Sequence, residues 1–246
     1  MKKLVAYITS GYPEKSFSVD LALALGENGV DTLELGIPFS DPVADGPLIE
    51  RASHRALELG FKFEHLLDIS KEIAPKIDTL WMGYFNSFYQ QNMDKLVPYA
   101  REIGVNGFII PDLPHEETLR YSDLFNSHDI SNISFVAPTD SDKRIEEIVK
   151  DSKKFIYMVA YTGITGSGNA EDLQSFLSSI KKYTNTPTYV GFGVNQKTAK
   201  EKVKGADGVI VGSAFIDILL KDELSYQQKI SECSELANII KNEINS

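Results

Sequence analysis

Eight short apolar runs rich in β-branched residues recur along this chain, each followed by a polar or Gly/Pro-containing loop and then an amphipathic stretch. Such strict alternation of strand and helix predicts parallel strands joined by right-handed crossovers. Eight units in 246 residues match the closed (β/α)8 TIM barrel, which typically needs ~250 residues. The expected strands are Leu4–Thr9, Thr32–Ile37, Thr79–Tyr84, Gly107–Pro111, Ile133–Ala137, Phe155–Ala160, Thr188–Phe192 and Gly208–Gly212.

The amphipathic stretches predict the covering helices, with an extra helix, Glu64–Ala74, in the long gap between strands two and three. No Gly/Ser linker divides the chain, so residues 1–246 are expected to form a single catalytic barrel domain. A doubly wound open sheet is the alternative, but it usually carries a dinucleotide fingerprint. The nearest candidate here, Gly191-Phe192-Gly193, has Gln196 where the third glycine belongs. The remaining expected helices are Ser16–Asn28, Leu48–Leu59, Met93–Ile103, Glu116–Asn126, Asp142–Asp151, Glu171–Tyr183, Gln196–Val203, Phe215–Leu220 and Ser225–Asn242.

The charge of the chain limits its partners. A formal net charge of −10 repels nucleic acid and anionic membrane surfaces, so a bound phosphate has to be held by local groups such as backbone N–H. Cys233 is the only cysteine, which excludes an intramolecular disulfide and a cysteine metal cluster. The apolar run at the start is too short for a signal peptide, and no stretch reaches the length of a membrane span. We therefore expect a cytoplasmic protein.

The second strand carries a carboxylate at an unusual place. Because side chains alternate between the faces of a strand, Leu33 and Leu35 pack under the helices and Glu34 faces the barrel interior. Glu34 also lies near the C-terminal end of its strand, where barrel active sites form. A buried glutamate paired with Lys or Arg is the alternative interpretation, but no strand places a basic residue near its C-terminal end.

The loop after this strand, Pro38–Pro47, contains three prolines and two aspartates. Proline limits the backbone, so a stiff loop can hold a carboxylate over the barrel mouth. Asp45 is the candidate, as a second catalytic carboxylate or as the N-cap of a helix with Pro47 near its first position. Spacing alone favours neither interpretation.

Two glycine-containing loops predict a phosphate site. Gly193 follows the seventh strand, and Gly212 and Ser213 follow the eighth. These two loops form the recurrent phosphate site of such barrels, because glycine lets backbone N–H groups approach an anion. After the sixth strand, residues 161–169 are small, polar and rich in glycine, which is typical of a closing lid or of an ordinary flexible connection.

The sequence gives little support to metal or Schiff-base catalysis. The four histidines are scattered and no pair has a metal-ligand spacing. Lys153 and Lys154 precede the sixth strand, at the barrel face opposite the expected site, so no Schiff-base lysine is indicated. We therefore expect general acid/base catalysis by carboxylates, with no metal and no cofactor held in this chain.

The segment from Leu33 to Pro47 closely resembles the signature of the tryptophan synthase alpha chain family, and the resemblance continues through short motifs along nearly the whole chain. The first motif alone is highly specific, whereas the glycine motifs alone are not. The continuing motifs are Tyr84-Phe85-Asn86, Pro111-Asp112-Leu113-Pro114, Thr162–Gly166, Gly191-Phe192-Gly193 and Gly212-Ser213-Ala214.

The resemblance implies reversible retro-aldol cleavage of indole-3-glycerol phosphate to indole and glyceraldehyde 3-phosphate. It implies that Glu34 is the general acid/base and that Asp45 interacts with the indole N–H. Tyr7, Tyr84, Tyr157 and Thr165 match pocket or lid positions, and the phosphate site matches Gly166, Gly193, Gly212 and Ser213.

The resemblance also implies a partner, a beta chain that holds pyridoxal phosphate (PLP) and receives the indole in an alpha2-beta2 tetramer. The contacting segments are expected to include Pro38, Asp41, Asn86, Asp112 and Pro114.

The sequence departs from the family pattern in a few places. It begins almost directly at the first strand, where many members carry a leading helix, so either another element closes that end or the barrel is less stable. Glu50 and Tyr161 stand where other residues are common, which affects lid contacts and coupling to a partner. The rival functions are an aldose–ketose isomerase on another phosphorylated metabolite and a catalytically silent partner barrel. Glu34 and Asp45 together argue against the silent barrel, and the Pro38–Pro47 loop argues against the isomerase.

Overall fold

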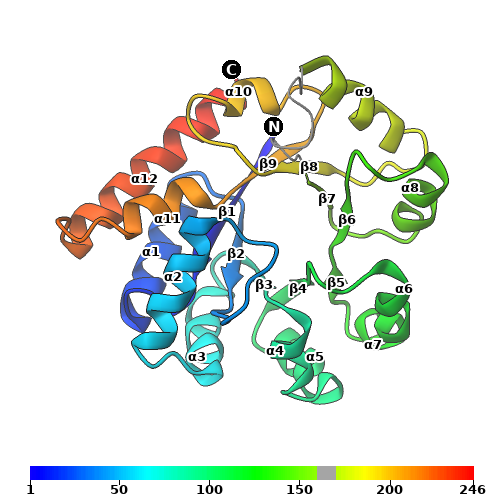
Figure 1. Ribbon diagram of the computed structural model, residues 1–246. Helices are drawn as coiled ribbons and strands as arrows, with labels where there is room; N and C mark the ends of the chain where they lie inside the picture. The colour runs from blue at the N-terminus through cyan, green and yellow to red at the C-terminus, as the bar shows by residue number, and fades with distance from the viewer. Residues whose placement is uncertain (160–169) are drawn as a thin grey trace.

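The computed structural model describes residues 1–159 and 170–246. Its parallel strands form the middle of the molecule and its helices the outside (Figure 1). The strands are β1 (Lys3–Thr9), β2 (Thr32–Gly36), β3 (Asp78–Met82), β4 (Val105–Ile109), β5 (Ser131–Asn132), β6 (Ser134–Val136), β7 (Ile156–Val159), β8 (Thr188–Gly191) and β9 (Gly208–Val211).

The helices follow the strands in the predicted alternation, including the extra helix α3 between β2 and β3. They are α1 (Lys15–Glu27), α2 (Pro47–Glu58), α3 (Phe63–Ile73), α4 (Phe85–Tyr89), α5 (Met93–Glu102), α6 (His115–Thr118), the 3-10 helix η1 (Leu119–Tyr121), α7 (Ser122–Ser127), α8 (Asp142–Val149), α9 (Ala170–Ile180), α10 (Ala199–Lys202), α11 (Ser213–Leu219) and α12 (Tyr226–Glu243).

The sheet closes into a barrel through its fifth strand. Every strand pair is parallel, and the order is β5-β4-β3-β2-β1-β9-β8-β7-β6. The two ends of this order, β5 and β6, are successive halves of residues 131–136: β5 pairs with β4, and β6 pairs with β7. One strand thus joins both ends, which confirms the (β/α)8 prediction and excludes the open sheet.

Three predicted elements differ in detail. The predicted fifth strand is two short pairings because its halves bond to different neighbours. The predicted helix Glu116–Asn126 is three pieces, interrupted where Tyr121 adopts φ −107° and ψ 1° and its ring lies 5.6 Å from that of Phe85. The predicted helix Gln196–Val203 begins only at Ala199, because residues 195–198 form a turn in which the Asn195 N–H donates to Thr198 Oγ1 (3.0 Å).

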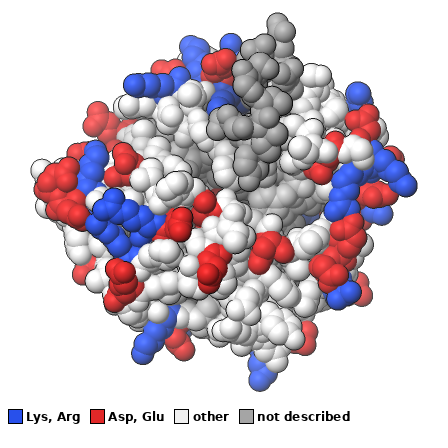
Figure 2. Space-filling model, viewed as in Figure 1, with Lys and Arg blue, Asp and Glu red and all other residues white. Residues whose placement is uncertain are grey.

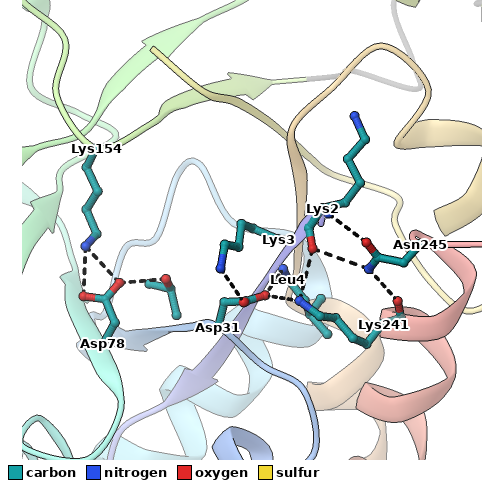
Figure 3. A network of polar contacts seen from close by, with 9 residues as sticks. Lys2, Lys3, Leu4, Asp31, Asp78, Lys154, Lys241 and Asn245 are labelled. Atoms are coloured by element: carbon teal, nitrogen blue, oxygen red, sulfur yellow. Dashed lines mark hydrogen bonds and ion pairs between the residues drawn. The ribbon is translucent and has the colours of Figure 1, made fainter.

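A polar network lies at the N-terminal end of the strands (Figure 3). Lys154, just before β7, forms a 2.9 Å ion pair with Asp78 at the start of β3. Asp31, just before β2, binds Lys3 at 2.9 Å and Lys241 of α12. Burial opposes both charges, but the lysines lower the pKa of Asp78 and of Asp31. This end of a barrel typically serves stability, and the active site forms at the other end.

Within residues 1–159 and 170–246, no helix is both long enough and apolar enough to span a membrane.

Candidate active site

A cavity of about 1050 Å³ opens at the C-terminal ends of the strands. It gathers residues from β1, β2, β7 and the loops after β2, β8 and β9, as expected of a barrel active site. Seven of the predicted site residues line it: Tyr7, Glu34, Asp45, Tyr157, Gly193, Gly212 and Ser213.

Glu34 lies inside the barrel at 2% exposure. Its position on β2 is level with Tyr7 on β1 and Leu80 on β3. Its Oε2 has no hydrogen-bond partner within the described residues, and no Lys or Arg there pairs with it. Burial, with a smaller contribution from the Asp45 charge, raises the pKa of Glu34 to about 8. The carboxyl group is therefore mostly protonated at neutral pH, as a proton donor must be.

Asp45 is held by Tyr84 rather than by a helix end. The helix α2 begins at Pro47 with Gly46 as its N-cap, so the capping role considered for Asp45 is not observed. The Tyr84 hydroxyl donates to Asp45 Oδ2 (3.1 Å) and accepts from the Ala44 N–H (2.9 Å). Tyr84 does not line the cavity; it orients the catalytic candidate that does.

The side chain of Asp45 is partly buried. Burial raises the pKa of Asp45 to about 6, although the Tyr84 hydrogen bond acts in the opposite direction. The pKa of Asp45 still lies below that of Glu34, so between the two values Asp45 is mainly ionised while Glu34 is mainly protonated.

The loop that carries Asp45 is clamped to α2. Ser53, which is buried, accepts a hydrogen bond from the Phe39 N–H (2.7 Å) and donates to the Phe39 carbonyl (2.9 Å). His54 Nε2 lies 2.9 Å from the Ser40 carbonyl. The ring of Phe39 stacks on that of Tyr84 at 5.1 Å. These contacts tie the loop to α2 and to Tyr84, which holds the Asp45 carboxylate in place.

Two glycines make room for the cavity tyrosines. A Cβ on Gly36 would lie 2.3 Å from the Tyr7 hydroxyl oxygen, and one on Gly191 would lie 2.3 Å from Tyr157 Cε1. The ring of Tyr157 also stacks on Phe135, another residue lining the cavity, at 5.0 Å. Burial raises the pKa of both tyrosines well above the ordinary value, so they face the cavity as neutral hydroxyls.

The loops after β8 and β9 both line this cavity. Phe192 and Gly193 both have positive φ, 72° and 65°, and both line the cavity. Gly212 precedes α11, and Ser213 begins it. A Cβ on Gly212 would lie 3.2 Å from Ile49 Cδ1, so little space remains there for a side chain. The predicted phosphate loops thus lie side by side along the cavity.

The remaining predicted positions fall into two groups. Thr165, Gly166 and the rest of the proposed lid lie outside the described residues. Of the predicted partner contacts, Asp41, Asn86, Asp112 and Pro114 are exposed, but Pro38 is buried by the fold itself. Asp112 also accepts a hydrogen bond from the Phe85 N–H (2.8 Å), so it fixes the start of α4.

Sequence reasoning missed several residues of the cavity. Ile49, Phe135 and Asn195 line it, although no motif pointed to them, and Phe192 lines it although only Gly193 of its motif was assigned to the phosphate site. The alternation of inward and outward side chains in the fifth predicted strand, Ile133–Ala137, could have indicated Phe135. Phe192, a phenylalanine at positive φ, has no such sequence signal.

The face that carries the site is acidic near its middle. Figure 2 shows Asp and Glu side chains near the middle of this face, and Lys and Arg mostly toward its rim. In the described part of the chain, no group of three or more His, Cys, Asp or Glu could hold a metal ion. The arrangement offers a proton donor, a nearby carboxylate and backbone donors in one cavity.

Similarity to known proteins covers the chain from end to end. The family model described as Tryptophan synthase alpha chain matches residues 1–245. The tryptophan synthase alpha chain of Wolinella succinogenes is 50% identical over 247 aligned residues, which cover 100% of this chain and 97% of the relative. The structure of tryptophan synthase subunit alpha from Campylobacter jejuni has a TM-score of 0.88 at 32% identity, covering 96% of this chain and 95% of that chain. A crystal structure of tryptophan synthase from M. tuberculosis gives 0.86 at 29% identity, covering 98% and 93%.

Proposed function

The chain belongs to the tryptophan synthase alpha chain family, and we propose that Glu34 and Asp45 are the carboxylates that perform its reaction. That reaction is the retro-aldol cleavage of indole-3-glycerol phosphate to indole and glyceraldehyde 3-phosphate in tryptophan biosynthesis, so the chain is a carbon–carbon lyase. The alpha chain needs no cofactor of its own, and PLP lies in the beta chain. One observation carries the assignment: Glu34 and Asp45 line the same cavity, where burial raises the pKa of Glu34 to about 8 and that of Asp45 to about 6.

Glu34 acts first as an acid and then as a base. The bond to be broken joins C3 of the indole ring to the carbon of the side chain that bears a hydroxyl group. Protonation of C3 by Glu34 makes the ring a better leaving group. The resulting carboxylate then takes the hydroxyl proton, the carbon–carbon bond breaks toward the ring, and the aldehyde forms. A carboxyl group can perform both steps near neutral pH because its pKa is about 8.

Asp45 stabilises the positive charge that develops at the indole nitrogen while C3 is protonated. Its pKa of about 6 keeps it mainly ionised under the conditions in which Glu34 still carries its proton. The Tyr84 hydroxyl holds Asp45 in position at 3.1 Å. Tyr7 and Tyr157 form the walls beside the reacting ring.

The phosphate end of the substrate binds at the loops after β8 and β9. Gly193, Gly212 and Ser213 support this placement because all three line the cavity that contains Glu34. Thr165 and Gly166 are assigned to the lid and the phosphate site by the resemblance alone.

A beta chain is the expected partner, in an alpha2-beta2 tetramer. Asp41, Asn86, Asp112 and Pro114 support this because they are exposed near the cavity loops. Val43, in the loop of Asp41, is 84% exposed, which is high for an apolar side chain outside an interface. Pro38 contributes by shaping the loop rather than by contact, since it is buried.

The domain organisation and the cellular location are also proposals. Residues 1–246 act as one catalytic domain, which the closed sheet supports. A cytoplasmic location is proposed from the biosynthetic role of the family.

The test incubates purified protein with indole-3-glycerol phosphate and measures released indole and glyceraldehyde 3-phosphate. We expect both products in equal amounts, and faster release when the cognate beta chain is added. An isomerase would consume the substrate without indole, and a silent barrel would leave it unchanged. Either result would contradict the proposed function. If indole is released but the beta chain does not accelerate its release, only the proposed partner is contradicted.

A further inference from the structure

Two successive carbonyls of the loop after β8 are bound by side chains from the α10 segment. Lys202 Nζ donates to the Phe192 carbonyl at 2.7 Å. Thr198 Oγ1 donates to the Gly193 carbonyl at 2.8 Å and accepts from the Asn195 N–H at 3.0 Å. Neither Lys202 nor Thr198 lines the cavity, so both hold the loop from behind.

These two contacts fix the direction of the N–H groups that follow. In a trans peptide the N–H points opposite to the C=O of the same unit. Because the carbonyls of Phe192 and Gly193 are tied toward α10, the N–H groups of Gly193 and Val194 are directed away from it. Gly193 and Val194 both line the cavity, and neither N–H donates to an acceptor within residues 1–159 and 170–246. An anion in the cavity would accept hydrogen bonds from both N–H groups.

The lysine contact is unusual in its setting. Lys202 is half-buried, and no carboxylate of the described chain lies within ion-pair distance of its ammonium. Burial lowers the pKa of Lys202, so its charge is held there at some cost. The backbone it holds is itself strained, since Phe192 has φ 72°. A charged donor on a strained peptide fits a role in fixing that peptide.

We infer that Lys202 and Thr198 are positioning residues for the substrate phosphate, each holding one peptide group so that its N–H faces the anion. The inference rests on the proposed function, because the phosphate is that of indole-3-glycerol phosphate. Lys202 acts through the Phe192 carbonyl and Thr198 through the Gly193 carbonyl, and neither touches the substrate.

The experiment compares Lys202→Met, Thr198→Val and Lys202→Arg with a control, Lys200→Met. Lys200 is an exposed lysine of the same short helix, so its replacement removes the same charge without touching the loop. We expect Lys202→Met and Thr198→Val each to raise the KM for indole-3-glycerol phosphate about tenfold, with kcat changed less than about twofold. Lys202→Arg and Lys200→Met should keep a wild-type KM.

A second readout separates phosphate binding from general damage. Inorganic phosphate, used as a competitive inhibitor, should bind about tenfold more weakly to the two affected variants, whereas the KM for indole in the reverse reaction should not change. Circular dichroism checks that each variant is folded.

Three outcomes would overturn the inference: wild-type phosphate inhibition in folded Lys202→Met and Thr198→Val, an equal loss in Lys200→Met, or an equal loss of indole and phosphate binding. A wild-type protein that releases no indole would instead contradict the proposed function.

Discussion

Replacing Glu34 with glutamine is expected to stabilise the fold increasingly as the pH rises. In the unfolded chain the Glu34 carboxyl ionises near its ordinary pKa of 4.5, but in the folded protein it keeps its proton up to about pH 8. The unfolded state therefore binds fewer protons than the folded state between these values, and the wild-type fold loses stability as the pH rises through this window. Well above pH 8, where Glu34 is ionised in both states, the stability of the fold does not fall further for this reason.

The magnitude follows from the same two pKa values. Each pH unit within the window costs about 1.4 kcal/mol, so the full penalty is about 5 kcal/mol, of which about 3 kcal/mol develops between pH 6 and pH 9. Glutamine has a similar shape and no charge, so the Glu34→Gln variant avoids this penalty. Its free energy of unfolding should exceed that of the wild type by about 3 kcal/mol more at pH 9 than at pH 6.

Urea unfolding of both proteins at several pH values measures the difference. Glu58→Gln is the matched control, because Glu58 is exposed on α2 and forms no ion pair in the described part of the chain. The control should follow the wild-type pH dependence. If Glu34→Gln also follows it, the carboxyl group of Glu34 does not keep its proton in the folded state, and the reasoning about its acid role is refuted.

Three further predictions concern catalysis. The kcat/KM should rise with pH through about 6 as Asp45 ionises and fall through about 8 as Glu34 loses its proton; a flat profile over this range would contradict the assigned protonation states. Tyr84→Phe should lower kcat about tenfold and shift the acidic limb to higher pH. In the wild type the Tyr84 hydrogen bond lowers the pKa of Asp45, so its removal raises that pKa. A shift to lower pH would show that Tyr84 does not stabilise the ionised form of Asp45. Gly212→Asp should raise the substrate KM more than about tenfold with the fold intact, since a carboxylate repels the phosphate and its Cβ would lie 3.2 Å from Ile49; an unchanged KM would remove the phosphate from this loop.

The fold was predictable because periodicity is local. Alternating apolar runs and amphipathic stretches predicted all eight strand regions and the extra helix α3. The helix α4 was missed because its start depends on Asp112, 27 positions away from Phe85, which accepts the Phe85 N–H. The split of the fifth strand was missed for a similar reason, since it arises from pairing with two different neighbours.

The candidate site also contains features that local sequence predicts and features that depend on distant residues. The interior position of Glu34 follows from the two-residue period of a strand, which needs no knowledge of the rest of the chain. The role of Asp45 stayed ambiguous because a helix that began one residue earlier would make Asp45 its N-cap, whereas the observed N-cap is Gly46. The Tyr84 hydroxyl comes from 39 positions further along the chain, and its contact with Asp45 removes that ambiguity only in three dimensions.

Some features had no local signal at all. Positive φ at Phe192 is rare for a bulky residue, so the sequence predicts no turn of that kind there. The space that Gly36 leaves is defined by the Tyr7 ring on the neighbouring strand, and no single-strand pattern contains it.

The most direct test of carboxylate catalysis is the kcat of folded Glu34→Gln with indole-3-glycerol phosphate. An amide at this position can neither give a proton to C3 nor take one from the hydroxyl, and loss of proton transfer typically lowers the rate ~10²–10⁴-fold. We expect kcat to fall by at least about a hundredfold while inorganic phosphate still binds as in the wild type. A near-normal kcat in the folded variant would contradict the assignment of Glu34 as the acid and base.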